Sequence, residues 1–333
     1  MARQVCSLGF PIFVKWYITS KCNIRCTHCY LEDYTHQEND MARILSTIDF
    51  LAENSVRSIT LLGGEPLVRK DLPVIARRIT EKGIALLIVT NGTLLTPELV
   101  AKLKASGATN YQVSIEGNTA TLNDNVRGEG NFCKTMSGVR LLVNAGLNVT
   151  LSITLTKQNH GSIRNIFELA NDVGVGEIRF NAFVPTGTGA QLDLSHSLTP
   201  QLSMQISSEL WALNKEFPSI KIAAGAFFKE IKWHPQGKGP TSTFGCGAAT
   251  TSLVINSDFS LSACDMLTEQ DRTQPIKAIE SIQKAWSEDP IFLKWRGQLV
   301  TSTDGKDQRN FGEVHQHGCH LAYTVYGENI FEH

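Results

Sequence analysis

The sequence predicts an α/β fold in which β-strands alternate with helices on a parallel sheet. Between residues 10 and about 184, short runs rich in Val, Ile and Leu alternate with amphipathic segments of ten residues or more. Several of these segments end at a glycine, which commonly stops a helix, as at Gly83, Gly107 and Gly146. Because such crossovers are right-handed, six units would wind into a partial, TIM-like (β/α)6 barrel that is closed or partly open.

The elements are predicted at regular intervals. The expected strands are residues 10–19, 58–63, 85–92, 110–116, 148–156 and 177–184. The expected helices between them are residues 41–55, 72–82, 96–106, 132–145 and 163–173. Thr96 followed by Pro97 is a typical helix start, because proline is favoured at the first helical position. In such barrels the loops after the strands form the active face.

The chain changes character after the sixth unit. Residues 185–198 are rich in Pro, Gly and small polar residues and predict a linker, so we expect a barrel domain at 1–190 and a second domain at 191–333. The second domain is predicted to be a small α+β unit. It begins with a helix at about 199–216 and continues with a strand pair at 251–256 and 261–267.

Composition excludes several classes of protein. The chain has 31 Lys and Arg against 32 Asp and Glu, so its net charge of −1 produces no basic field for nucleic acid or a membrane surface. Its longest apolar run, at 84–89, is too short to cross a bilayer, and the N-terminus lacks the layout of a signal peptide. We therefore predict a cytoplasmic protein with no nucleic-acid or membrane partner. Its eight cysteines are then not expected to form a disulfide framework.

Three cysteines follow the first predicted strand in the pattern C-x3-C-x2-C: Cys22, Cys26 and Cys29. A loop this short can curl three thiolates around one metal centre. A four-iron cluster usually has four cysteine ligands, so three would leave one iron open to another ligand. Zinc held by the three cysteines and His28 or His36 is the alternative. Cysteines that merely pack in the interior are the third interpretation.

With the segments that follow the next strands, this triad resembles the radical S-adenosylmethionine (SAM) superfamily. After the second strand, Gly63-Gly64-Glu65-Pro66 resembles the family's GGEP segment, where the backbone meets the amino group of SAM. Glycines allow a backbone to approach a ligand closely, and a glutamate suits an ammonium group. An ordinary strand-to-helix turn is the alternative.

Weaker matches lie at the ends of the later strands, within a resemblance that covers residues 14 to about 190. The positions where the family contacts SAM or its surroundings correspond here to Asn91, Ser114, Glu116, Thr154 and Asn159. Asp124 and Arg127 resemble the family's D-x-x-R-G stretch, which implies that Arg127 pairs bidentately with the cofactor carboxylate. A solvated surface arginine is the alternative.

The resemblance implies a radical SAM enzyme that carries a [4Fe-4S] cluster and binds SAM at its open iron. An electron, from a donor such as flavodoxin or ferredoxin, would break the S–C5′ bond to give methionine and a 5′-deoxyadenosyl radical. That radical would take a hydrogen atom from an unactivated substrate carbon. The protein would hold the radical beside one C–H bond and exclude water.

The C-terminal part resembles a SPASM or twitch extension, a β-hairpin and helix that carry auxiliary clusters. A full SPASM domain has more cysteines than this segment, so the resemblance implies at most one auxiliary cluster, held by Cys246, Cys264 and Cys319. Phe259 stands where the family hairpin has glycine. The cluster's remaining site would be open to substrate or bound by a nearby residue: Asp265, His315, His317 or His320. A degenerate extension without a cluster is the alternative.

Two cysteines lie outside both groups. Cys6 and Cys133 are candidates for a thiol that donates a hydrogen atom, as radical epimerases use, and a partly buried structural cysteine is the alternative for each.

Enzymes with this extension commonly modify peptides, so we expect oxidation, cross-linking or epimerisation of a ribosomally made precursor (a RiPP). Only 21 residues precede Cys22, too few for a leader-binding domain, which predicts a separate leader-peptide-binding protein. A small molecule is the alternative substrate: an amino sugar, a nucleotide or a haem precursor. A non-catalytic iron–sulfur or zinc scaffold is the alternative to an enzyme.

Overall fold

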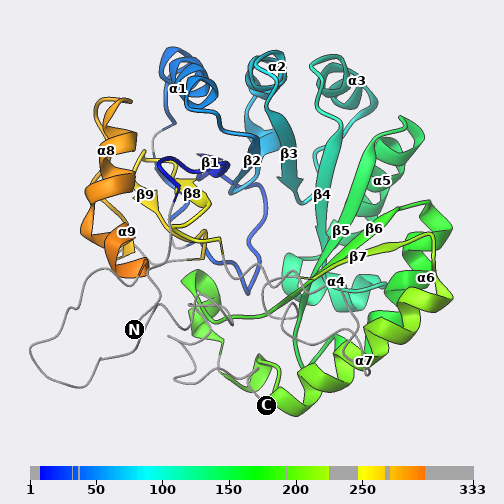
Figure 1. Cartoon of the computed structure of the whole chain (residues 1–333). Helices are drawn as coiled ribbons and strands as arrows, with labels where there is room; N and C mark the ends of the chain where they lie inside the picture. The colour runs from blue at the N-terminus through cyan, green and yellow to red at the C-terminus, as the bar shows by residue number, and fades with distance from the viewer. Residues whose placement is uncertain are drawn as a thin grey trace, which may run out of the picture.

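The structure is a computed structural model that describes residues 8–31, 33–36, 38–192, 194–224, 247–266 and 271–296 (Figure 1). Cys6, Cys246 and Cys319 lie outside these residues, and so do the three histidines at 315, 317 and 320. Within the described ranges, no helix has the length and apolar character needed to span a membrane.

The six predicted strands are present and lie side by side in chain order, each parallel to the next. They are β1 (Phe13–Thr19), β2 (Ser58–Gly63), β3 (Ala85–Thr90), β4 (Asn110–Ile115), β5 (Asn148–Leu155) and β6 (Glu177–Ala182). The sheet runs in the order β7-β6-β5-β4-β3-β2-β1-β8-β9, so β1 and β6 do not pair with each other. The predicted barrel is therefore the partly open form.

The predicted helices are also present, within a few residues of the expected bounds. They are α1 (Met41–Glu53), α2 (Leu72–Glu81), α3 (Pro97–Ala105), α5 (Asn131–Asn144), α6 (Ile163–Val173) and α7 (Pro200–Glu216). Local chemistry explains their ends. Thr96 accepts a hydrogen bond from the Leu99 N–H and caps α3, with Pro97 at the first position. Gly83, Gly107 and Gly146 follow helices with φ of 73°, 83° and 71°, a region that favours glycine.

Several short elements are missing from the sequence prediction. An additional helix, α4 (Ala120–Arg127), lies between β4 and α5. The predicted linker contains two short 3₁₀ turns, η3 (Gly187–Gln191) and η4 (Leu194–His196). Two further 3₁₀ turns, η1 (Pro66–Val68) and η2 (His160–Ser162), follow β2 and β5. These segments are too short or too polar to produce a recognisable helical period.

The two faces of the curved sheet differ in polarity. In Figure 1 the helices α1, α2, α3, α5 and α6 lie outside the curve of the strands. On β5, Leu151 and Ile153 are fully buried in the hydrophobic core that includes these helices. The alternate residues, including Ser152 and Thr154, face the inner side of the curve. The core therefore lies between sheet and helices, and the inner face is left for polar groups.

Segments after residue 190 extend the same sheet at both edges. The unpredicted strand β7 (Lys221–Ala224) pairs in parallel with β6. The predicted strand pair is β8 (Ser252–Ile255) and β9 (Leu261–Ser262), which are antiparallel, and β8 pairs in parallel with β1. The helices α8 (Ser281–Glu288) and α9 (Pro290–Trp295) lie beside this hairpin (Figure 1). The division into two domains at residue 190 stays a prediction, because strands from both sides share one sheet.

The hairpin turn explains how Phe259 takes the place of a glycine. Phe259 has a φ of 64°, the left-handed conformation that glycine adopts most readily. Its ring is 1% exposed, makes an edge contact with Trp16 at 5.9 Å and lies 3.9 Å below the guanidinium of Arg43. Burial of the ring offsets the backbone cost, which is about 1–2 kcal/mol for a residue with a side chain.

Candidate active site at the carboxyl ends of the strands

The cysteine triad lies on the loop after β1, which we call the triad loop (residues 20–31). Its backbone is curled by hydrogen bonds from Cys29 N to Cys26 O at 3.3 Å and from Thr27 N to Val126 O of α4 at 2.9 Å. All three thiols are partly buried. Burial raises the pKa of Cys22, and it raises that of Cys26 to about 11. A bound metal would reverse this effect, because coordination deprotonates a thiol outright.

The histidines of the zinc alternative are engaged elsewhere. The His28 Nε2 atom lies 3.0 Å from Glu116 Oε1. The His36 imidazole lies between Asp33 Oδ2 at 3.1 Å and Ser257 Oγ at 2.9 Å. In the part of the chain that the structure describes, no three His, Cys, Asp or Glu residues are grouped to hold a single ion. A four-iron cluster makes no such demand, because each thiolate binds a different iron.

The two glycines after β2 are required by the triad loop itself. A Cβ atom on Gly64 would lie 2.2 Å from the carbonyl oxygen of Lys21, and one on Gly63 would lie 2.2 Å from that of Thr19. At the same place Gly64 N donates to Thr19 O at 2.9 Å, and Glu65 N donates to Lys21 O at 2.8 Å. A side chain at either glycine would therefore collide with the backbone that leads into the triad loop. The sequence analysis explained these glycines only by the close approach of a ligand.

Glu65 is 1% exposed and connects the ends of β2 and β3. Its carboxylate accepts hydrogen bonds from Leu67 N at 3.0 Å, Thr90 Oγ1 at 2.7 Å and Asn91 N at 2.7 Å. Burial raises its pKa, although these donors act in the opposite direction. A carboxylate can accept about four hydrogen bonds, so the predicted contact with an ammonium would use the remaining position. Pro66 opens the short turn η1 beside it.

Asn91 connects the end of β3 to the triad loop. Its Nδ2 donates to Asn23 Oδ1 at 2.9 Å, while its Oδ1 accepts from the N–H and hydroxyl of Thr93. Asn91 is 6% exposed, so this amide is held inside the protein. The predicted cofactor residue therefore lies next to the triad, and its side chain also has a structural role.

Glu116, at the end of β4, is the centre of a buried network. Its Oε1 accepts from Arg127 Nε at 2.9 Å and lies 3.0 Å from His28 Nε2. Its Oε2 accepts from Thr154 N at 3.2 Å, and its backbone oxygen accepts from Asn159 Nδ2 at 3.0 Å. Burial would raise the pKa of Glu116, but the charges of His28 and Arg127 outweigh it and hold that pKa below its usual range.

Arg127 is 8% exposed, so the interpretation as a solvated surface arginine is wrong. Two of its nitrogens donate to Glu116, and a third, Nη1, lies 3.9 Å from Cys26 Sγ. Asp124 on the same helix, α4, accepts from the N–H groups of Gly130 and Phe132 at 2.8 Å each and so joins α4 to the start of α5. The predicted pairing with a cofactor carboxylate stays a prediction, and Arg127 has further N–H groups for it.

The remaining predicted cofactor residues, Ser114 and Thr154, are half-buried. They lie on neighbouring strands, with Ser114 opposite Ser152 of β5. By strand alternation both point to the inner side of the curved sheet. The inner face beside the triad loop is therefore polar.

Of the other predicted cysteines, the structure describes Cys133 and Cys264. Cys133 is exposed on α5, so its interpretation as a partly buried structural cysteine is wrong. Cys264 follows β9 and is partly buried, with its sulfur 3.7 Å from Asp265 Oδ1. Asp265 also accepts from Lys15 Nζ at 2.7 Å, and its backbone oxygen accepts from the Tyr17 hydroxyl. Cys264 is therefore positioned next to the inward-facing residues of β1.

Sequence reasoning missed how His28 and Asn23 act. It considered His28 only as a zinc ligand, whereas the structure places it on Glu116. Asn23 was not selected, although it contacts the predicted cofactor residue Asn91. Their positions inside the C-x3-C-x2-C segment were a usable signal, because a loop around a cluster must also be held to the strands around it.

The comparisons with known proteins agree with this geometry. The profile of the Radical SAM superfamily matches residues 16–170. An AdoMet-dependent heme synthase of Methanosarcina barkeri is 30% identical over 306 residues, which are 86% of this chain and 85% of that protein. The mycofactocin maturase MftC of Mycolicibacterium smegmatis is 28% identical over 297 residues, 87% of this chain and 73% of that protein.

A solved structure has the same fold over nearly the whole chain. Streptococcus suis SuiB, bound to its precursor peptide SuiA, superposes with a TM-score of 0.77 and covers 98% of this chain and 75% of that one. The sequence identity is 16%, so this similarity concerns the fold alone.

Proposed function

Because this chain belongs to the radical SAM superfamily, we propose that Cys22, Cys26 and Cys29 hold its [4Fe-4S] cluster and that the enzyme modifies a peptide. The donor set fits the cluster, since cysteine sulfur is the ligand that iron–sulfur clusters use. When bound, the cluster and SAM supply the one-electron chemistry that removes a hydrogen atom from a substrate carbon. The non-enzymatic alternative, a scaffold without catalysis, has no support from the relatives.

The observation that carries this proposal is the set of contacts around the triad loop. The ends of three strands hold it: Gly64 after β2, Asn91 after β3, and Glu116 after β4 through His28. Arg127 places a positive charge beside Cys26, which favours the thiolate form that a metal needs. These residues position the thiols at the carboxyl ends of the strands.

The test is anaerobic reconstitution followed by two measurements. We expect iron and sulfide to bind, and we expect 5′-deoxyadenosine and methionine to form from SAM in the presence of a reductant. The variant Cys22→Ala/Cys26→Ala/Cys29→Ala should lose both. Zinc in place of iron, or no cleavage of SAM by iron-loaded wild type, would overturn the proposal.

A peptide substrate is supported by the relatives and by the inner face. MftC is named a maturase, and the SuiB structure holds a precursor peptide. The inner face of the sheet offers polar groups such as Ser114 and Asn181, which suit the amides of an extended chain. The expected partners are the peptide and an electron donor such as flavodoxin or ferredoxin. A cytoplasmic location follows from the same cysteine chemistry.

A tetrapyrrole is the second candidate substrate, and one observation favours it. The heme synthase of Methanosarcina barkeri is 30% identical to this chain along most of both proteins. Incubation of the reconstituted enzyme with an iron tetrapyrrole or with a peptide encoded beside its gene distinguishes the two. The substrate that increases the rate of SAM cleavage and changes in mass is the correct one.

We also propose one auxiliary cluster, to which Cys264 contributes together with Cys246 and Cys319. Its support is the position of Cys264, which the hairpin brings beside Tyr17 and Lys15 of the barrel sheet. Such a cluster would accept an electron from a substrate radical or bind a substrate heteroatom. The measurement is iron content after reconstitution, about eight per chain with the cluster and about four without it.

A further inference from the structure

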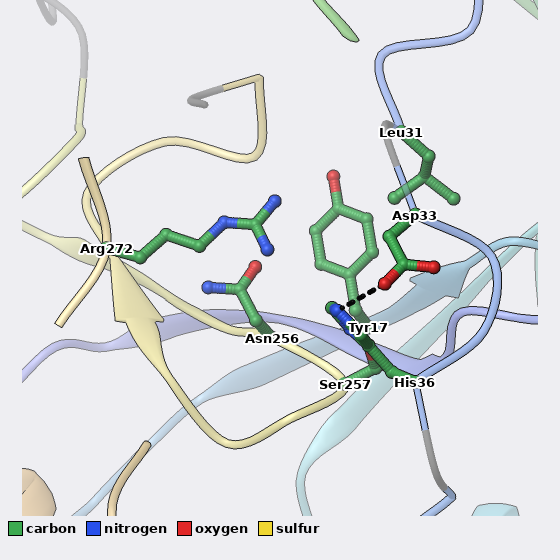
Figure 2. A pocket seen from close by; sticks show the side chains of 7 residues that line it. All are labelled: Tyr17, Leu31, Asp33, His36, Asn256, Ser257 and Arg272. Atoms are coloured by element: carbon green, nitrogen blue, oxygen red, sulfur yellow. Dashed lines mark hydrogen bonds and ion pairs between the residues drawn. The ribbon is translucent and has the colours of Figure 1, made fainter. Parts of the chain in front are cut away.

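A small cleft lies between the segment that follows the triad loop and the C-terminal hairpin (Figure 2). Asp33 and His36 form one side, Asn256 and Arg272 form the other, and Tyr17 of β1 lies between them. Its cavity volume is about 10 Å³, which is space for one water-sized group. An oxygen of a ligand's functional group can occupy it, and the rest of that ligand would lie outside the cleft.

Arg272 is the uncommitted charge in this cleft. Its Nε atom is buried and has no hydrogen-bond partner in the described residues. Figure 2 shows its guanidinium extending into the cleft towards Tyr17. Arg78 and Arg296 also have a buried unpaired nitrogen, but Arg78 donates to Asp49 and Arg296 donates to the Ala249 carbonyl oxygen through another atom. Arg179 of β6 shares the unpaired Nε of Arg272, but it does not line this cleft. A buried charged donor without an acceptor is unfavourable, so this site favours a ligand that accepts hydrogen bonds.

The polar groups on the opposite side of the cleft have partners of their own. Asp33 Oδ1 accepts from the N–H and hydroxyl of Thr35 at 2.7 and 2.6 Å, and its Oδ2 lies 3.1 Å from His36 Nε2. His36 is in turn 2.9 Å from Ser257 Oγ through its Nδ1 atom. Asp33 therefore has its own partners, and in Figure 2 it enters from the side opposite Arg272.

The floor of the cleft touches both cysteine regions. The Tyr17 hydroxyl donates to the backbone oxygen of Asp265, the residue after Cys264. The Tyr17 ring makes an edge contact at 6.2 Å with Tyr30, the residue after Cys29. A group held in the cleft therefore lies between the triad loop and the hairpin.

We propose that this cleft binds a carboxylate of the substrate and that Arg272 is its anchor. A guanidinium presents paired N–H groups that match the two oxygens of a carboxylate, which makes it the residue best suited to this ligand. The inference rests on the proposed function, since it assigns a chemical class to the substrate of the same site. The carboxylate has two sources, an acidic or C-terminal group of a peptide or a propionate of a tetrapyrrole.

The test is equilibrium binding to the full-length, cluster-loaded protein. The probes are coproporphyrin III, followed by its absorbance, and a fluorescein-labelled penta-glutamate peptide, followed by anisotropy, each beside its amide analogue. We expect Arg272→Gln to weaken binding of a carboxylate probe tenfold or more, the loss of a charge-assisted hydrogen bond. Arg272→Lys should recover part of the affinity. The matched control Arg140→Gln, which removes an exposed guanidinium on α5, should stay within twofold of wild type.

Each outcome is decisive. If Arg272→Gln loses affinity for only one of the two probes, the porphyrin or the peptide, the result supports the carboxylate site and identifies the source of the carboxylate. Equal binding by wild type and Arg272→Gln, equal binding of the amide analogues, or no saturable binding of either carboxylate probe overturns it. Circular dichroism and the Arg272→Lys protein distinguish lost binding from lost folding. SAM cleavage by wild type is measured separately, so its absence would overturn the proposed function and leave the binding result to be judged by itself.

Discussion

The triad loop and the C-terminal hairpin both carry cysteines predicted to hold iron, yet they are built in different ways. The triad is local, and hydrogen bonds from the loops after β2, β3 and β4 hold it in place. The hairpin contributes Cys264, while its predicted partners are Cys246, shortly before the hairpin, and Cys319, far along the chain, and both lie outside the described residues. When all ligands lie in one loop, their spacing in the sequence is enough to predict the site. When the ligands come from separate segments, the fold must first bring those segments together, and the sequence spacing does not show whether it does.

The most severe change should be removal of the triad. We expect Cys22→Ala/Cys26→Ala/Cys29→Ala to abolish SAM cleavage and to reduce bound iron by about four per chain. Product analysis after anaerobic incubation and iron determination measure both effects. Residual cleavage at the wild-type rate would contradict the assignment of the cluster to this loop.

Replacement of the hairpin cysteine, Cys264, tests whether the hairpin and the triad loop bind iron independently. Cys264→Ala should lower the iron content by about four per chain if the auxiliary cluster exists, while the triad keeps its own iron. The same iron and sulfide determination measures it. The exposed Cys133 offers a matched control, because Cys133→Ala should leave the iron content as in wild type. Identical iron in both variants would mean that the hairpin carries no cluster.

Loss of the charge at the centre of the network should be the largest effect on folding stability. Glu116→Gln leaves the buried Arg127 without its carboxylate, and breaking a buried ion pair costs about 3–5 kcal/mol. Urea unfolding of the metal-free protein measures it.

The matched control for Glu116→Gln is a pair at the surface. Glu216 pairs with Arg164 at 2.6 Å, and both side chains are about half exposed. Glu216→Gln should cost less than about 1 kcal/mol, because water screens such pairs. Equal losses in the two variants would show that the Glu116 network does not hold the loop.

The smallest expected effect concerns the close approach between the loops after β1 and β2. Gly64→Ala places a Cβ 2.2 Å from the Lys21 oxygen, and such overpacking costs about 1–3 kcal/mol. Gly161 has no atom within 4 Å of the same position, so Gly161→Ala should change stability by less than about 0.5 kcal/mol. Thermal unfolding compares the two. An unaffected Gly64→Ala protein would show that the triad loop moves away without cost.

Sequence reasoning was most successful where one period or one spacing decides the structure. The strands of the barrel were predicted because the strands of a buried parallel sheet appear in the sequence as continuous runs of Val, Ile and Leu. It missed α4, whose eight residues are mostly polar, and β7, which has only four residues. Short elements have little periodicity of their own and form because their neighbours pair with them or pack against them.

The sequence by itself determined the α/β repeat, the position of the triad after β1 and the family to which the chain belongs. Each depends on residues close together in the chain, whose spacing limits their geometry. Only the tertiary structure decided that Arg127 is buried on Glu116, that Gly64 makes room for the triad loop, and that Arg272 faces Tyr17 across a cleft. These contacts join residues far apart in sequence, and the strand order and register of the folded sheet bring them together.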